Sequence, residues 1–164
     1  MMLIRPIVYA FSLVLLGCAS AHAAPTLLQQ YGAWGAYSYH SESGTVCYVL
    51  AVPTSQTPPN VDHGKNYFMV SRTANGEEPE ALMGYMLKSG SKIQLTIGDR
   101  TFTMFSSDDK GWVENASDEP AVVNAMRSGS DMSLAAVSKK GTATGYSYSL
   151  SGITAALQKI GLCK

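Results

Sequence analysis

The two histidines beyond residue 23 are the first place to look for metal or acid–base chemistry in this sequence. His63 directly follows Asp62, and an adjacent imidazole and carboxylate can supply two ligands to a metal site. A complete site needs three or four converging ligands, and no further His or Cys pair at ligand spacing accompanies them. His40 follows an alternating segment on its polar side. We therefore predict no metal site, with Asp62-His63 in a solvated loop and His40 exposed and uncommitted.

Nucleophilic and carboxylate chemistry has equally little support. The sequence has no G-x-S-x-G elbow, no S-x-x-K with its companion motifs and no glycine loop of the kind that cradles phosphate. The carboxylate pairs Glu77-Glu78 and Asp108-Asp109 stand in turn-like surroundings, where solvated charge is the ordinary interpretation. We predict no catalytic residue and no cofactor. A small periplasmic hydrolase is the alternative, because two carboxylates that face each other across a cleft do not show in sequence spacing.

Aromatic residues are the other set that could carry function. Most are expected to pack in the core or on a sheet face, but a few exposed together would make a contact surface, since Tyr and Trp are enriched at binding hot spots. The set comprises Trp34, Tyr37, Tyr39, Tyr67, Tyr85, Trp112, Tyr146 and Tyr148.

Residues 1–23 have the three parts of a secretory signal peptide. Arg5 supplies a positive charge, Ile7–Leu16 is apolar, and Ala21-His22-Ala23 is a small-x-small cleavage site. The apolar stretch is too short for a bilayer-spanning helix, which takes roughly 20 residues. We therefore predict cleavage between Ala23 and Ala24, no membrane span, and a protein that is periplasmic, secreted or associated with the outer membrane.

A lipid anchor is the alternative at the same place. Leu15-Leu16-Gly17-Cys18 resembles a bacterial lipobox, in which Cys18 would be lipidated and become the mature N-terminus. The Ala-x-Ala site lies at a comfortable distance from the apolar stretch, and Leu16 is an unusual lipobox residue. Ordinary cleavage is therefore favoured, and both routes take the protein out of the cytoplasm.

Composition limits what the exported part can bind. The chain carries 12 basic and 12 acidic residues, and loss of Arg5 leaves 11 against 12. A nearly neutral domain has no broad field to attract nucleic acid or an anionic membrane. Residues 24–164 suffice for a single domain that buries roughly two-thirds of its unfolded surface.

The cysteines predict one disulfide. Cys18 is removed by one processing route and lipidated by the other, so Cys47 and Cys163 are the remaining thiols either way. An even pair in an oxidising compartment indicates a disulfide. Two buried free thiols are the alternative.

The pattern from Trp34 onward predicts strands and turns. One segment, KIQLTI-GD-RTFTMF, is the clearest, because Gly98-Asp99 suits a two-residue hairpin turn. That register sets Leu95 opposite Phe102 on the core face, and Thr96 and Thr101 on the water face. Further strands are expected at Trp34–Tyr39, Thr45–Val52, Asn66–Thr73, Glu80–Leu87, Gly111–Glu114, Asp131–Lys139 and Thr142–Leu150, with a long surface loop at Pro53–Lys65.

Two short helices complete the predicted fold. Ser117 or Asp118 caps the first, which has Pro120 in its first turn and Gly129 just past its end. The second follows Ser151 and ends at Gly161. About nine short strands and two helices predict an all-β fold, mainly an antiparallel sandwich or barrel.

Several segments resemble the invasion-associated locus B family of small exported proteins from Gram-negative bacteria. They are YGAWGAYSY (Tyr31–Tyr39), VCYVL (Val46–Leu50), the GWVENASDE stretch and YSYSLSGITAAL (Tyr146–Leu157). The last is the most specific, because family members typically end in a Ser-Leu-x-Gly-Phe/Ile-Thr-x-Ala-Leu element. Many members also carry a cysteine shortly after the Trp of the first strand, which this chain lacks, so no second disulfide is expected.

The resemblance implies an envelope β-domain that acts through contacts with another protein, in a family associated with virulence and bacterial entry into host cells. None of the shared motifs is catalytic. The expected function is therefore non-enzymatic protein binding, with a periplasmic hydrolase or a ligand-carrying β-barrel as alternatives.

Overall fold

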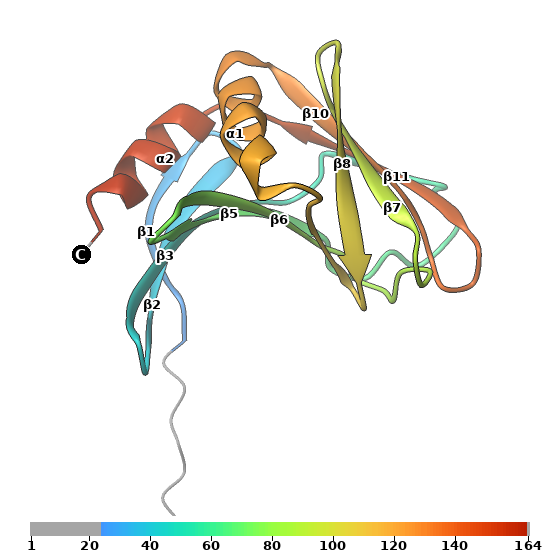
Figure 1. Ribbon diagram of the computed structural model, residues 1–164, viewed down its shortest axis with the longest axis horizontal. Coiled ribbons are helices and arrows are strands. Elements are labelled where there is room, and N and C mark those ends of the chain that lie inside the picture. Colours follow the sequence, from blue (N-terminus) through green and yellow to red (C-terminus); the bar gives the residue numbers. More distant parts are fainter. Residues whose placement is uncertain (1–23, 164) are drawn as a thin grey trace, which may run out of the picture.

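The computed structural model describes residues 24–163, and its strands form one antiparallel sheet (Figure 1). The strand order is β1-β2-β3-β5-β6-β9-β8-β7-β10-β11-β4. The bounds are β1 Thr26–Tyr31, β2 Trp34–Ser41, β3 Gly44–Ala51, β4 Ser55–Thr57, β5 Tyr67–Thr73, β6 Gly76–Leu82, β7 Lys92–Ile97, β8 Arg100–Ser107, β9 Lys110–Val113, β10 Asp131–Val137 and β11 Ala143–Ser149. The predicted all-β class is confirmed. The predicted signal peptide and Cys18 lie outside the described residues.

The sheet curls so that its two halves enclose the core. Trp34 on β2 is fully buried, and its indole N–H donates to the carbonyl of Ser149 at 2.9 Å, at the end of β11. Phe68 on β5 meets Tyr148 on β11 edge to face, with ring centroids 6.1 Å apart. These strands are far apart in the hydrogen-bonded order, so a single curled sheet provides both walls of the core. Edge-to-face packing is a favoured arrangement of aromatic pairs.

Both helices pack on the inner face of the β1–β2–β3–β5–β6 half (Figure 1). α1 (Glu119–Ser128) follows a 3-10 turn at Ala116–Asp118, and α2 is Ile153–Gly161. Each buries one apolar stripe, which is how an amphipathic helix is held against a sheet. Among residues 24–163, no helix is long and apolar enough to cross a bilayer.

The predicted disulfide joins Cys47 on β3 to Cys163, just beyond α2. The Cα atoms are 6.3 Å apart, inside the range that a disulfide requires. Cys47 points into the core at 4% exposure, so the bond fastens the end of α2 to the inner face.

The β7–β8 hairpin has the predicted register. Leu95 pairs with Phe102 and Thr96 with Thr101, across a turn in which Gly98 has φ +58°. Leu95 is fully buried, whereas Phe102 is half-buried and packs at the margin of the core. The two threonine hydroxyls lie 3.3 Å apart on the opposite face. Alternation and turn chemistry therefore set both the pairing and the faces.

The structure corrects three strand predictions. β1 was not predicted, and β4 lies within the segment predicted as a loop. The strand predicted over Glu80–Leu87 instead spans Gly76–Leu82 and contains Pro79, which is tolerated because β9 pairs only with Glu80–Leu82. Beyond Leu82 the chain turns away, because Gly84 packs directly against the loop before β5.

Candidate functional site

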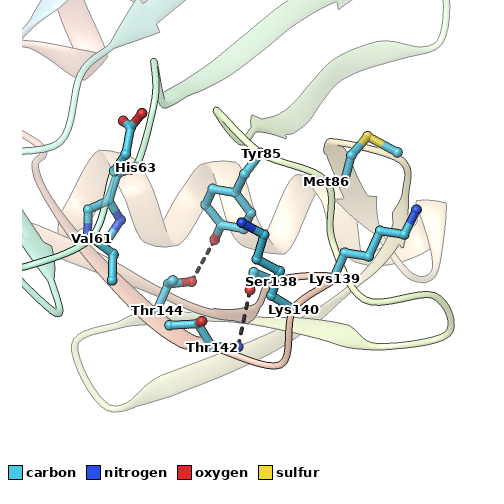
Figure 2. A pocket seen from close by; sticks show the side chains of 10 residues that line it. Val61, His63, Tyr85, Met86, Ser138, Lys139, Lys140, Thr142 and Thr144 are labelled. Carbon is cyan, nitrogen blue, oxygen red and sulfur yellow. Dashed lines mark hydrogen bonds between the residues drawn. The ribbon is translucent and has the colours of Figure 1, made fainter.

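A pocket of about 440 Å³ opens where three connecting segments meet (Figure 2). The segments are the β4–β5 loop, the stretch between β6 and β7, and the β10–β11 hairpin. The lining residues are Val61, Asp62, His63, Tyr85, Met86, Ser138, Lys139, Lys140, Thr142 and Thr144.

Two glycines in close contact set the position of the first two segments. A Cβ on Gly64 would lie 2.4 Å from the Gly84 carbonyl oxygen, and a Cβ on Gly84 would lie 2.3 Å from the His63 carbonyl oxygen. Gly64 also has φ +61°, a left-handed conformation that favours glycine. Asn66 bridges the contact, because its amide donates to His63 O at 2.7 Å and its carbonyl oxygen accepts from Gly84 N–H at 3.1 Å.

Backbone hydrogen bonds hold the third segment in place. Lys139 N–H donates to Met86 O at 2.8 Å, which ties the β10–β11 hairpin to the stretch before β7. Ser138 Oγ accepts from Thr142 N–H at 3.1 Å and closes the turn (Figure 2). The lysines of this turn therefore stand beside Met86 on a fixed rim.

His63 is buried under the pocket rather than solvated, so the prediction of a solvated Asp62-His63 loop is wrong for this residue. It is 7% exposed, with Nε2 2.8 Å from the Pro58 carbonyl and Nδ1 2.8 Å from the Tyr146 hydroxyl. A carbonyl only accepts, so Nε2 carries the proton and Nδ1 of the neutral ring accepts from Tyr146. Sequence alone does not show this, because the burial comes from the Gly64–Gly84 contact.

The Asp-His pair does not assemble a metal site in the described part of the chain. Both imidazole nitrogens are engaged, and Asp62 Oδ1 accepts the Gly64 N–H at 2.9 Å. Within residues 24–163 no group of three His, Cys, Asp or Glu side chains could hold a metal ion.

Two side-chain hydroxyls that are hydrogen-bonded to each other form one wall of the pocket. Figure 2 shows Tyr85 and Thr144 reaching toward one another, with their hydroxyl oxygens 2.6 Å apart. Thr144 Oγ1 donates to the Ala136 carbonyl at 3.3 Å, so Tyr85 must be the donor to Thr144. Burial raises the pKa of Tyr146. The hydroxyl protons of Tyr85 and Thr144 are therefore both donated within the protein. The two hydroxyl oxygens still have lone pairs that can accept hydrogen bonds.

This arrangement is suited to binding a molecule. Three of the lining side chains, His63, Tyr85 and Thr144, are held by hydrogen bonds to each other, to Tyr146 or to the backbone. His63 contacts a tyrosine hydroxyl and a carbonyl rather than a serine or cysteine nucleophile. Lys139, Lys140 and Asp62 are the charged groups of the lining, and all three are exposed.

The other residues considered for chemistry do not line this pocket. His40 is exposed as predicted, 3.3 Å from the Thr45 hydroxyl. Glu77 does not lie in a solvated turn: it is on β6 and accepts two hydrogen bonds from Arg127 on α1, at 2.7 and 2.8 Å. Asp108-Asp109 forms the exposed β8–β9 turn, as its surroundings predicted.

The outer face of the sheet carries a second candidate site, the outer aromatic face, made of Tyr37, Tyr39, Tyr48, Phe105 and Trp112. Tyr37 stacks on Tyr48 at 5.4 Å, and Tyr39 meets Tyr48 edge to face at 6.2 Å. Phe105 and Trp112 form a second stacked pair at 5.4 Å. Burial, and then the neighbouring Tyr37 and Tyr39, raise the pKa of Tyr48.

Sequence analysis found the outer aromatic face only in part. Trp34, Tyr146 and Tyr148 are core residues, in line with the expectation that most aromatics pack inside. Phe105 and Tyr48 were not singled out, although alternation around the buried Met104 and Val49 places them on the outer face. The pocket could not be predicted from the sequence, because its walls come from three segments that are distant in sequence.

Comparison with known proteins gives one match. The family model described as Invasion associated locus B (IalB) protein matches residues 34–161, which is most of the chain. No curated protein and no solved structure matches.

Proposed function

This chain belongs to the Invasion associated locus B (IalB) protein family, and we propose from that membership that it works in the cell envelope by binding another protein. In this proposal residues 1–23 direct export, and the folded part resides in the periplasm, at the outer membrane or outside the cell. The protein acts through contacts rather than catalysis, and its role is in host-cell invasion. The secretory pattern of residues 1–23 and the Cys47–Cys163 disulfide support the extracytoplasmic location.

The observation that carries the binding proposal is the outer aromatic face. Both helices lie on the inner side of the β1–β2–β3–β5–β6 half of the sheet, and no other described element covers the outer side of that half, which carries the tyrosine cluster (Figure 1). Phe105 and Trp112 lie on β8 and β9 in an open groove that Glu119, at the start of α1, also lines. Phe105 is 40% exposed, and Tyr37, Tyr39 and Trp112 are half-buried although they are large and aromatic. Exposed aromatic side chains of this kind are enriched among the residues that dominate protein–protein affinity.

Strand register joins the two aromatic clusters into one strip. Trp112 is directly opposite both Phe105 and Glu80, Glu80 is opposite Met69, and Met69 is opposite Leu50. Residues opposite one another in antiparallel strands share a face, so this row crosses β8, β9, β6, β5 and β3 without interruption. The tyrosine cluster begins at its β3 end, where Leu50 is two residues from Tyr48.

Charge along the strip favours a partner with basic groups. Glu80 lies in the row, and Lys110 Nζ is 3.2 Å from its Oε1 but makes no well-directed hydrogen bond. Glu78 and Glu119 line the open groove that contains Phe105 and Trp112. Burial, and then the negative charge of Glu78, raise the pKa of Glu119, as expected for two neighbouring carboxylates.

Site-specific photocrosslinking tests the proposal. A photoreactive phenylalanine analogue is placed at Phe105 on the outer aromatic face and, as the control, at the exposed Gln158 on α2. Illumination of intact cells should give a discrete protein adduct from position 105 and not from position 158. Trp112→Ser should weaken that adduct, because it removes the ring stacked on position 105.

The adduct must then be reproduced with purified components. Once the captured protein is identified by mass spectrometry, its affinity for the unmodified domain should fall by at least tenfold on Trp112→Ser, as for a hot-spot residue. Identical adducts from both positions, or an unchanged affinity, would refute the role of this face.

A further inference from the structure

We propose that the pocket between Tyr85, Met86 and the Lys139-Lys140 turn binds a small amphipathic anion, such as a medium-chain aliphatic carboxylate. This site is separate from the outer aromatic face and adds a ligand to the protein-binding function proposed above.

The size and apolar lining of the pocket suit a small molecule. Its volume of about 440 Å³ falls within the usual range of ligand pockets, roughly 300–1,000 Å³. Val61 and Met86 reach it from different segments and are 38% and 45% exposed, although neither carries a polar group. The Tyr85 ring lies between them in the lining (Figure 2). Three apolar surfaces therefore converge on one space, where a ligand hydrocarbon would remove them from water.

The rim supplies the positive charge. Lys139 and Lys140 are exposed in the β10–β11 turn, and neither is within salt-bridge distance of a carboxylate among the described residues. Asp62 is the one carboxylate of the lining, so the charged lining residues sum to +1. The backbone hydrogen bond from Lys139 to Met86 places this charge next to the apolar lining, as an amphipathic ligand requires.

The hydroxyls of Tyr85 and Thr144 in the lining determine the orientation of the ligand. Tyr85 donates its proton to Thr144, and Thr144 donates to Ala136, so the pocket meets acceptor lone pairs there. A carboxylate placed against these oxygens would be repelled, because neither side has a proton to share. The negative group must therefore lie at the lysine rim, with the hydrocarbon directed toward Tyr85.

Calorimetric titration with octanoate and with octanol tests this inference, because the two probes have the same number of carbon atoms and only octanoate carries a negative charge. The full disulfide-bonded domain should bind octanoate about fivefold or more tightly than octanol, as two partly exposed ion pairs would provide. Lys139→Ser/Lys140→Ser should abolish the difference. The control Arg100→Ser/Lys159→Ser removes the same charge outside the pocket and should preserve it.

A second variant separates the pocket from adsorption elsewhere. Met86→Asp adds a negative charge at an exposed lining position, so it should leave the melting temperature unchanged and eliminate octanoate binding. Equal affinity for the two probes, no binding by the unmodified domain at millimolar probe, or equal loss in both double variants would overturn the proposal. Photocrosslinking from Phe105 should be the same in all these variants, so failure here is distinguishable from failure of the protein-binding proposal.

Discussion

Removing the hydroxyl oxygen should lower stability at one of the two buried tyrosines on β11 and not at the other. Tyr146 and Tyr148 are 2% and 0% exposed and point to the same face of the strand. The Tyr146 hydroxyl donates to His63 Nδ1 at 2.8 Å, whereas the Tyr148 hydroxyl has no hydrogen-bond partner among the described residues. Each Tyr→Phe variant is therefore the matched control of the other.

The magnitudes follow from what each substitution leaves behind. Tyr146→Phe leaves a buried imidazole nitrogen without its donor, which should lower the unfolding free energy by about 1–3 kcal/mol. Tyr148→Phe removes a buried hydroxyl that makes no hydrogen bond, so the unfolding free energy should stay the same or rise by about 1 kcal/mol. The ring contact with Phe68 is retained in the second variant.

Urea denaturation, followed by tryptophan fluorescence, measures both changes. In a separate thermal denaturation, at roughly 3–5 °C per kcal/mol for a domain of this size, the melting temperatures of the two variants should differ by at least about 3 °C. Equal destabilisation would mean that the Tyr148 hydroxyl also has a partner. If Tyr146→Phe leaves the unfolding free energy unchanged, the His63–Tyr146 hydrogen bond and the tautomer derived from it are refuted.

Four further predictions follow from the same structure. Leu95→Ala should cost about 2–5 kcal/mol of unfolding free energy and Thr96→Ala less than about 0.5 kcal/mol, measured in urea, and equal costs would contradict the face assignment. Reduction of the Cys47–Cys163 bond should lower the unfolding free energy, measured by urea denaturation, by about 2–5 kcal/mol. Maleimide labelling of the denatured protein before reduction should find no thiol. Intact mass of the exported protein should correspond to a chain that begins at Ala24, and a diacylglyceryl mass would favour the lipid anchor. Burial raises the pKa of both β11 tyrosines, so above about pH 10 the unfolded chain releases these protons and the folded chain keeps them. Their contribution to stability should therefore be constant below that pH and fall above it, and in an ultraviolet titration both should ionise later than tyrosines without a raised pKa.

Local pattern was sufficient wherever local physics decides the outcome. The β7–β8 hairpin follows from alternation on two strands and a glycine that adopts positive φ, so its register could be predicted residue by residue. The disulfide follows from the parity of the cysteines, and α1 follows from Pro120 and Gly129 at its ends.

The features that could not be predicted from the sequence depend on contacts between distant segments. β4 has three exposed residues in a proline-rich loop and forms because the curled sheet offers β11 as a neighbour. His63 is buried because Gly64 and Gly84 approach within a distance that no side chain allows. The pocket brings together three segments that are distant in sequence, so its lining is not visible in any one of them.

The Cys47–Cys163 bond has a consequence for the survival of the protein outside the cytoplasm. Every strand from β4 to β11, and the exposed loop between β4 and β5, lies between the two cysteines, whose sequence separation is 116. A protease that cuts this loop would leave two pieces joined covalently and packed in one sheet. The cut should therefore appear on a denaturing gel only after reduction, and the nicked protein would keep its outer aromatic face until the bond is reduced.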